Sequence, residues 1–474
     1  MTDNYFNSEE FKDNLSHFED ARKEGKGCIL SSDEIADIAE YYYEQGDFAK
    51  AKEIAEYATS LYPDATAPLV FLARFQMTVK KDMDMAWKYL TAIKDTEDSE
   101  YVIMMAEYLF NDGQREEAID TLERGLVVVD SDDAQDFIID ASFLLLDFAE
   151  IGTAKKWAER YEDKNDEEFQ RLRARIALES KDGDKAAKIM NELIDKNPFN
   201  EDYWNLLATI QIASDKYSDA ATSSEYAIAI NGDSSEAYMN QGNAYFKMCN
   251  YDKALEAYKQ FSKLNRNEIG DIMQARCYFC KQDLENALKH LKRAKDCCTD
   301  NKANLIDVYK DMAIIFGWAG ENERAFKCID RLKKEGYNDA ELYLIEGGVL
   351  LGMDKFKEAS TTFMNGYEKS KQPQEYMFQV AVSFYERNFD QAAYTMLKEI
   401  FYIEPDRTRG LAYLAVCCNY LGKKDEFLKY LKMAIEKNPD EARAVLAEIF
   451  PRGMEIYDYY KYAVDFFDRQ KGNS

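Results

Sequence analysis

A unit of about 34 residues recurs along this chain, and it constrains the fold more than any other feature. One copy, residues 235–268, reads SEAYMNQGNAYFKMCNYDKALEAYKQFSKLNRNE. Apolar side chains recur every three or four residues in two stretches, separated by a tight turn at 248–250. This period predicts two amphipathic helices. Because neither helix can bury its apolar stripe by itself, the pair needs neighbours and predicts a stacked array.

Copies of the unit follow one another at a nearly constant step. Twelve begin near residues 32, 66, 99, 134, 167, 201, 235, 268, 306, 340, 374 and 408. Nine of the eleven steps are 33 or 34 residues and one is 35. The step from 268 to 306 is 38 residues and predicts an insertion around Thr299–Asn304. We therefore expect a repeat array over residues 32–441, with capping segments at 1–31 and 442–474.

Two positions of the unit are restricted to small side chains. Position 8 is small in all twelve units: Ala39, Ala73, Ala106, Ala141, Ala174, Ala208, Gly242, Ala275, Ala313, Gly347, Ala381 and Ala415. Position 20 is alanine in nine units: Ala51, Ala118, Ala186, Ala220, Ala254, Ala287, Ala325, Ala359 and Ala393. Ala86 and Ala154 stand one residue out of register, and Phe427 breaks the rule. Antiparallel helices approach closely only where facing side chains are small, so these positions predict the contact within each pair.

A third position carries proline just past the second helix, where proline ends a helix. Position 32 is proline in four units: Pro63, Pro198, Pro405 and Pro439. A small residue at 8, alanine at 20 and proline at 32 together resemble the tetratricopeptide repeat (TPR). The chain is similar to the long TPR-only proteins of bacteria. The resemblance implies an all-α, right-handed superhelix of about twelve helix-turn-helix repeats with helical caps.

Composition supports the helical class and excludes several kinds of partner. Only 7 prolines and 21 glycines occur in 474 residues, as in long stretches of helix. The 89 acidic side chains exceed the 61 basic ones, for a net charge of −28. Such a chain repels phosphate backbones and anionic membrane surfaces, so we expect neither nucleic acid nor membrane as a partner. We see no signal peptide and no long apolar run, so we expect a cytoplasmic protein with reduced thiols.

The two flanks carry helical patterns of their own. The first runs from Glu9 to Glu24, and the last is rich in aromatic residues: Tyr457, Tyr460, Tyr462, Phe466 and Phe467. Terminal repeats of a solenoid have an apolar face that must be covered, so we expect both flanks to act as caps. A docking surface is the alternative for the last helix.

Motifs for catalysis are missing from the sequence. The chain has two histidines, His17 and His290, and no phosphate-binding loop, nucleophile elbow or dinucleotide fingerprint. The segments outside the repeats are too short to form a catalytic domain. The sequence therefore predicts a protein that is not an enzyme and has no cofactor.

Two clusters look like metal sites and fail on geometry. Cys277 and Cys280 lie in the first helix of their unit, whereas Cys297 and Cys298 lie at the far end of the second. Zinc ligands must converge on one point, so these thiols are not expected to bind metal, and their role stays open. The acidic run at 130–136 lacks the glycine and glutamate of a calcium loop and predicts a helix start instead.

In the TPR family the first helix of each unit lines an inner groove through positions 2, 5, 9, 12 and 13. Units five to nine would present Arg171, Arg175, Asn205, Asn243, Lys247, Arg276 and Lys310. The later units would present Trp318, Phe378, Tyr385 and Tyr420. Basic and amide groups followed by aromatic ones predict a groove for an extended peptide with acidic and apolar side chains. The alternative is that these are ordinary solvated surface residues.

The sequence thus predicts a non-catalytic protein–protein interaction scaffold that binds a peptide or protein segment in the concave groove. A structural subunit of a larger multiprotein assembly is one alternative. A peptide-responsive regulator is less favoured, because it would need a DNA-binding domain. The carboxylate clamp of TPR co-chaperones is not matched, since Asn240 lacks the required neighbours in the adjoining units. The identity of the partner and the oligomeric state stay open.

Overall fold

Helices make up all the regular structure that the chain shows. The computed structural model describes residues 5–6, 8–23, 27, 29–265, 267–298, 302–337, 339–447, 449–451 and 453–472, and no strand occurs among them. This confirms the predicted all-α class. The chain divides into two compact units: unit 1 holds residues 1–277 and 292–305, and unit 2 holds residues 278–291 and 306–474. The division passes through one helical hairpin.

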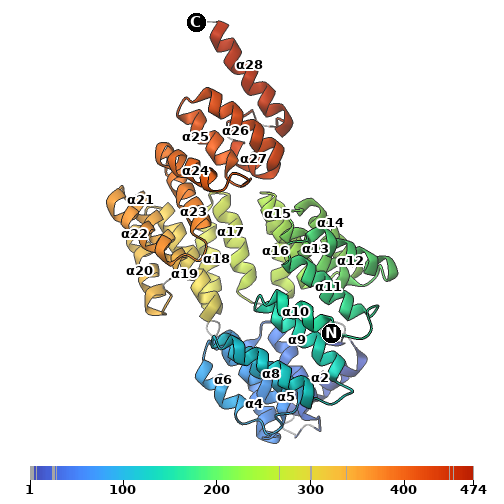
Figure 1. Ribbon diagram of the computed structural model, residues 1–474. Coiled ribbons are helices and arrows are strands. Elements are labelled where there is room, and N and C mark those ends of the chain that lie inside the picture. The colour runs from blue at the N-terminus through green and yellow to red at the C-terminus, as the bar shows by residue number, and fades with distance from the viewer. Residues whose placement is uncertain are drawn as a thin grey trace. The chain divides into compact units, whose positions relative to one another are not determined.

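Unit 1 begins with a single helix, α2 (Glu9–Lys23), followed by helix pairs (Figure 1). The pairs are α3 (Ser32–Glu44) with α4 (Phe48–Leu61), α5 (Thr66–Phe75) with α6 (Met83–Leu90), α7 (Ser99–Asn111) with α8 (Arg115–Val128), α9 (Ala134–Asp147) with α10 (Ile151–Ala158), α11 (Glu167–Glu179) with α12 (Gly183–Lys196), α13 (Glu201–Ala213) with α14 (Tyr217–Ile230), and α15 (Ser235–Lys247) with α16 (Tyr251–Leu264). The hairpin at the division is α17 (Ile269–Cys280) with α18 (Leu284–Cys297).

Unit 2 continues the same pattern and ends with extra helices. Its pairs are α19 (Lys302–Trp318) with α20 (Asn322–Lys334), α21 (Ala340–Gly352) with α22 (Phe356–Lys369), α23 (Pro373–Glu386) with α24 (Asp390–Ile403), and α25 (Leu411–Tyr420) with α26 (Lys424–Lys437). The helices α27 (Pro439–Leu446) and α28 (Tyr459–Gly472) follow. Helix α19 begins at Lys302, so the extra residues predicted near Thr299–Asn304 extend this helix by about one turn where they are described. Residues 299–301 lie outside the described part.

Polar side chains start the first helices, as the sequence pattern predicts. Ser31 and Glu34 form a capping box: Ser31 Oγ accepts from the Glu34 amide at 3.2 Å, and Glu34 Oε2 accepts from the Ser31 amide at 2.7 Å. Asp98 caps α7 and Asp166 caps α11 by one bond each, accepting from the amides of Tyr101 and Phe169. Acidic residues in the first turn add a favourable interaction with the helix dipole. Part of the large negative charge is therefore helix-start chemistry.

The turn between the helices of each pair contains one residue in the left-handed backbone region. In most units it stands at position 15, as do Gly113, Asp215 and Cys249. In the units that start at 66 and 134 it stands one residue later, at Lys81 and Ala149. Those are the two units whose position-20 alanine is one residue out of register. The cause in the first of them is the π-helical stretch 76–80, which inserts a residue before the turn.

The small residues at position 8 are buried in every unit, and the two glycines show why size is limited there. A Cβ atom at Gly242 would lie 2.4 Å from the Tyr258 ring, and one at Gly347 would lie 2.3 Å from the Phe363 ring. In both units the ring belongs to the second helix and fills the space that a methyl group would take. The predicted close contact within the pair is confirmed by this geometry.

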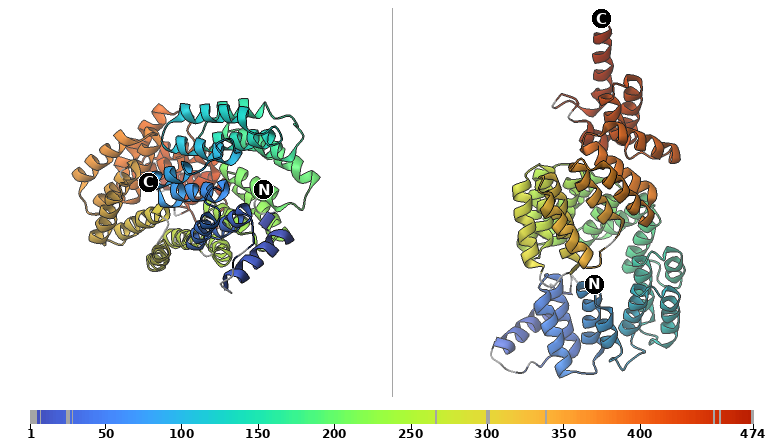
Figure 2. Two further views of the ribbon diagram at one scale, coloured as in Figure 1. Left: turned by 90° about the horizontal axis from the view of Figure 1, so that it is seen from below. Right: turned by 90° about the vertical axis from the view of Figure 1, so that its left-hand side faces the viewer.

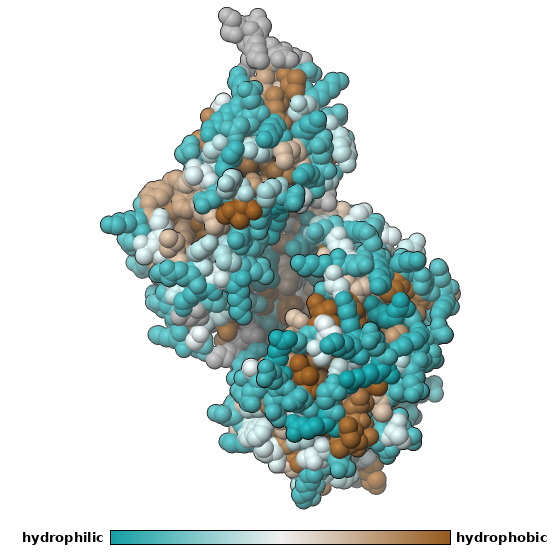
Figure 3. Space-filling view, viewed as in Figure 1, coloured by the Kyte–Doolittle hydropathy of each residue, from teal (hydrophilic) through white to brown (hydrophobic). Residues whose placement is uncertain are grey.

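Successive first helices form a continuous inner surface in unit 1. Helix α3 packs on α5, α5 on α7, α7 on α9, and α9 on α11. Each second helix packs behind them, as α4 does on α5. The sides of these first helices that line the inner surface are therefore not needed for contacts between helices. Hydrophilic side chains cover much of the molecular face seen in Figure 3.

Both ends of the array are covered by helices. Phe11 and Phe18 of α2 are buried against the first pair, where Phe11 contacts Tyr41 with ring centroids 5.3 Å apart. At the other end, Tyr459 of α28 stacks on Phe450 at 4.1 Å. Ala463 is also buried and Phe467 packs on Phe427 at 6.0 Å, and only the C-terminal end of α28 projects in Figure 1 and Figure 2. The predicted helical caps are thus present, and α28 leaves one face uncovered.

The substitution Gly242→Ala is expected to lower the free energy of unfolding by up to about 2 kcal/mol. Overpacking a core costs about 1–3 kcal/mol, and alanine recovers only about 1 kcal/mol in helix propensity. Adding Tyr258→Leu recreates the Ala106 and Leu122 combination of the third unit and should restore much of the loss. Urea and thermal unfolding of both single variants and the double variant measure this coupling. Purely additive effects would contradict the assigned contact.

Candidate functional site

The eleven groove residues predicted from the sequence divide between the two units. Unit 1 holds Arg171 and Arg175 on α11, Asn205 on α13, Asn243 and Lys247 on α15, and Arg276 on α17. Unit 2 holds Lys310 and Trp318 on α19, Phe378 and Tyr385 on α23, and Tyr420 on α25. The basic and amide residues, with the exception of Lys310, thus belong to one unit and the aromatic residues to the other.

Arg175 is neutralised within the chain. Its Nη2 lies 3.2 Å from Asp147 Oδ1, and its Nε lies 2.9 Å from Glu179 Oε1. Both carboxylates would compete with an acidic ligand for the guanidinium. The arginine therefore offers less free positive charge than its position in the repeat predicts.

The two asparagines of the predicted set support the packing of the repeats. Asn205 is 1% exposed, its Nδ2 donates to Ser234 Oγ at 3.3 Å, and its backbone carbonyl accepts from Asn240 Nδ2 at 3.3 Å. Asn243 Oδ1 accepts from the Tyr258 hydroxyl at 2.8 Å, across its own helix pair. Asn205 presents no side chain to a partner, because the neighbouring repeat covers it.

In unit 2, Lys310 is held by acidic neighbours. Its Nζ lies 2.7 Å from Glu341 Oε2 and 2.9 Å from Asp307 Oδ1. Burial lowers the pKa of Lys310, but the hydrogen bonds to Glu341 and Asp307 outweigh it, so the net pKa is raised. The charge is retained and already paired.

The aromatic residues of the set differ in exposure. Phe378 is 2% exposed and lies in the core of unit 2, because the Arg407 guanidinium covers its ring at 4.8 Å. Trp318 is half exposed beneath the Arg387 guanidinium at 4.5 Å, and Tyr420 is exposed. Phe378 is thus a packing residue. The repeat register places it on the inner side, but its ring is covered and is not presented to a partner.

The structure contains an acidic inner groove that the sequence analysis missed. It has a volume of about 700 Å³ and is built by the first helices of the first four pairs, α3, α5, α7 and α9. Six carboxylates line it: Asp37, Glu40, Glu100, Glu107, Asp140 and Asp147. Arg74 and Lys81 line the same groove, together with apolar side chains such as Phe71 and Phe143. Negative charge and apolar surface therefore share one concave site.

Crowding in the groove disfavours the ionised carboxylates. Burial raises the pKa of all six above the ordinary value. For Asp140, burial and then repulsion from Glu168 and Asp136 raise the pKa to about 6. For Glu107, burial exceeds the opposing effect of Arg74, whose Nε lies 3.9 Å from Glu107 Oε2. The groove would gain stability from an added cation.

The signal for this groove was present in the same register that predicted the basic residues. Position 9 of the first three units reads Glu40, Arg74 and Glu107, and position 2 includes Glu100. Counting inward positions from the first unit onward would have found these residues. Asp140 and Asp147 stand at other positions, and only the packing of α9 shows that they line the groove.

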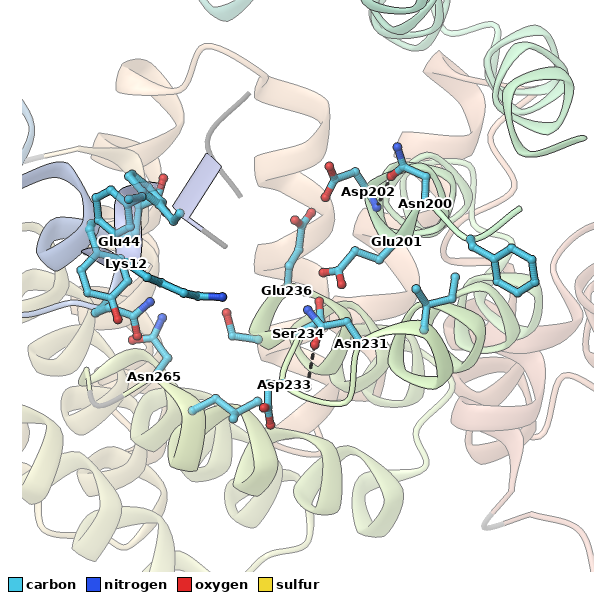
Figure 4. Close-up of a pocket in the computed structure, with 18 of the residues that line it drawn as sticks. Lys12, Glu44, Asn200, Glu201, Asp202, Asn231, Asp233, Ser234, Glu236 and Asn265 are labelled. Carbon is cyan, nitrogen blue, oxygen red and sulfur yellow. Dashed lines mark hydrogen bonds between the residues drawn. The ribbon is translucent and has the colours of Figure 1, made fainter. Parts of the chain in front are cut away.

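A second polar pocket of about 740 Å³ lies at the edge of unit 1. Figure 4 shows Lys12 and Glu44 on one side and the loops before α13 and α15 on the other. The labelled polar residues are Lys12, Glu44, Asn200, Glu201, Asp202, Asn231, Asp233, Ser234, Glu236 and Asn265. Several hold the loops themselves: Asn231 Oδ1 accepts from the Asp233 amide at 3.0 Å, and Asn200 Oδ1 from the Asp202 amide at 3.0 Å. Acidic groups outnumber basic ones here as well.

Beside this pocket the first repeat touches the loop that follows α16. Gly46 has a φ of +75°, and a Cβ atom there would lie 2.8 Å from Asn267 Cβ. Residues more than two hundred positions apart therefore meet at this point of unit 1. No sequence pattern predicts this contact, because it depends on the rotation accumulated over seven repeats.

Metal-binding geometry is not found in the described part of the chain, where no three histidine, cysteine or acidic side chains are placed to hold an ion. Cys277 and Cys298 are buried, whereas Cys280 and Cys297 are exposed. Burial raises the pKa of the Cys298 thiol above its ordinary value. Within the described residues, no helix is both long and apolar enough to span a bilayer.

Paired helices stacked around a shared inner surface define a helical-repeat protein. Two sequence models of the tetratricopeptide repeat match the chain, at residues 171–237 and 235–267. Residues 171–267 thus carry tetratricopeptide repeats, which confirms the resemblance to the TPR superfamily found in the sequence. No curated protein matches the sequence.

Solved structures similar to this chain include other TPR proteins. Yeast Tom70 is 14% identical with a TM-score of 0.45, over 92% of this chain and 96% of that one. A chain of the APC/C hetero-tetramer Cut9–Hcn1 is 13% identical with a TM-score of 0.39, over 82% and 90%. A TPR protein from Parabacteroides merdae is 14% identical with a TM-score of 0.44, over 53% and 98%. Likenesses of this degree assign neither a partner nor a process.

The substitution Asp140→Asn is expected to raise the melting temperature at about pH 7.5 and to change it little at about pH 4. The carboxyl holds its proton up to about pH 6 in the folded state but only to about 3.9 when unfolded. Its contribution to stability is therefore lost as the pH rises through about 6. Asp120→Asn on the exposed face of α8 is the matched control and should show no such pH dependence. An equal effect of Asp140→Asn at both pH values would contradict the assignment.

Proposed function

We propose that this chain is a non-catalytic protein–protein interaction scaffold whose inner groove in unit 1 binds a basic segment of a partner. TPR repeats support protein binding in general. The finer proposal rests on the groove itself, which has a volume of about 700 Å³. Six carboxylates and two cationic side chains line it. A segment with lysine or arginine and apolar side chains fits this surface.

The energetic reason is that burial, and to a lesser degree repulsion between acidic neighbours, disfavours the ionised carboxylates. Their raised pKa values measure how poorly the folded protein accommodates the ionised forms. A bound cation would relieve this repulsion and form charge-assisted hydrogen bonds. One of these carboxylates, Glu107, also pairs with Arg74 between α5 and α7. Val70 and Phe71 supply apolar contacts next to Glu40 and Arg74.

The acidic peptide predicted from the sequence stays a prediction for the surface of α11 to α17. Arg171, Lys247 and Arg276 are the basic residues concerned, in addition to Arg175. The ion pairs of Arg175 with Asp147 and Glu179 weaken this alternative. Charge reversal at Arg175 and Arg276 should abolish capture of an acidic segment if the alternative holds.

The structural-subunit alternative has support from the outer helices. Large apolar side chains are exposed there in both units, including Val127 of α8 and Tyr402 of α24. Such residues are typical of surfaces that other proteins cover, although single exposed apolar side chains are also common. No observation favours the peptide-responsive regulator.

A peptide pair of opposite charge tests the proposal. Two labelled peptides of about 12 residues are long enough to cross four helices in extended form. They share apolar residues and carry either lysine or glutamate elsewhere. Fluorescence anisotropy should show binding of the lysine peptide to the full chain, weakening with salt. Binding should strengthen as the pH rises from about 5 to about 7.5, because the groove carboxylates then ionise.

Variants identify the surface involved. Glu40→Gln with Glu107→Gln should weaken binding by roughly tenfold or more, since two contacts of about 1 kcal/mol each are lost. Glu116→Gln with Asp120→Asn on the exposed face of α8 makes the same charge change outside the groove and should have little effect. Equal losses in both double variants, or preferential binding of the glutamate peptide, would contradict the proposal.

A further inference from the structure

Unit 2 has an apolar groove on its outer side, between the second helices of two neighbouring pairs. Helices α22 and α24, the second helices of neighbouring pairs, form its walls, and residues of α23 form its base. Its volume is about 1080 Å³, the upper end of the range for ligand sites, so it can hold several large side chains. Met364, 62% exposed, and Phe356 stand at its wall. Figure 3 shows hydrophobic side chains gathered over this part of unit 2.

A buried hydroxyl lies at the base of the groove. Tyr376 is 4% exposed, lines the groove, and its Oη has no hydrogen-bond partner among the described residues. Gly366 leaves the space for it, because a Cβ atom there would lie 2.0 Å from this oxygen. Buried polar groups in native proteins are nearly always hydrogen-bonded. Tyr376 is an exception, because its Oη is enclosed against Gly366 and is not open to the groove.

The charge of the groove is negative. Asp390 and Glu399 line it, and no lysine or arginine is among its lining residues. An occupant with a basic group beside its apolar side chains is complementary to this lining.

The chain itself carries a helix with these properties. In α28, Ala463 is buried against unit 2, whereas Tyr462 and Phe466 are stacked on each other and point outward, Phe466 being 49% exposed. These two rings are four residues apart, the spacing of anchors in helix-in-groove recognition. Lys461, which is exposed, precedes them.

We propose that α28 of one copy of this chain docks, through Tyr462 and Phe466, into the groove between α22 and α24 of a second copy. The apolar walls receive the two rings, and Lys461 faces the acidic side chains of the groove. Because the groove and the helix are different surfaces, one such contact is heterologous. Two contacts made reciprocally close a dimer, and repeated contacts in one direction give a chain of copies.

Sedimentation of the full-length protein between about 1 μM and about 1 mM tests the proposal, since small interfaces associate in this range. The wild-type mass should rise with concentration. Met364→Glu in the groove and the pair Tyr462→Ser with Phe466→Ser in α28 should each leave a monomer. Tyr402→Ser removes an aromatic ring that is 86% exposed on α24 outside the groove, and association should persist. Circular dichroism confirms that the variants keep their helices.

A mixing experiment separates a specific contact from a loss of folding. The groove variant still has an intact α28, and the α28 variant still has an intact groove, so an equimolar mixture should associate although neither does by itself. A labelled peptide of residues 457–474 should likewise bind the α28 variant and not the groove variant. A wild-type protein that stays monomeric over the whole range, or a mixture that does not associate, would overturn the proposal. So would binding of an unrelated amphipathic helix to the groove in preference to the 457–474 peptide.

Discussion

The close contact between the two helices of each pair is the constraint on which the rest of the structure depends. Its signature is a small residue at position 8, and the second helix adapts to it. Where position 8 is glycine, at Gly242 and Gly347, the facing residue is an aromatic ring. In the alanine units the residue at the corresponding place, allowing for the one-residue shift in two units, is aliphatic or small: Ala55, Leu90, Leu122, Ala158, Met190, Ser224, Leu291, Ile329, Leu397 and Leu431. An aromatic ring thus stands at this place of the second helix only in the units where position 8 is glycine.

Because each first helix makes this contact on one side, its side toward the inner surface is available for charged residues. In unit 1 the consequence is an inner surface on which Glu40, Glu107 and Asp140 stand close together with raised pKa values. Helix-start residues account for another part of the acidity and carry a structural role. Two kinds of acidic residue are therefore present in unit 1, and burial in the groove raises the pKa of the second kind. This effect is what a cationic partner would oppose.

The repeat register predicted the helix pairs because it depends on contacts within about 34 residues. The same register contains the acidic residues Glu100 at position 2 and Glu40 and Glu107 at position 9. The burial of Phe378 could not be predicted from register, because Arg407 covers its ring from another segment. The burial of Asn205 depends on the next repeat, and the contact of Gly46 with Asn267 on seven repeats together. Local spacing carries no information about such long-range contacts.

Zero-length cross-linking with a carbodiimide tests the central claim, that the inner surface of unit 1 is the binding surface, most directly. The reagent joins a lysine amine to a carboxylate that it contacts, and mass spectrometry then locates the linked residue. The chain offers 89 acidic side chains, most of them outside the groove. The account predicts that a bound lysine peptide is linked mainly to groove carboxylates such as Asp37, Glu40, Glu107 and Asp140. Links spread evenly over exposed carboxylates, including those of α8, would contradict it.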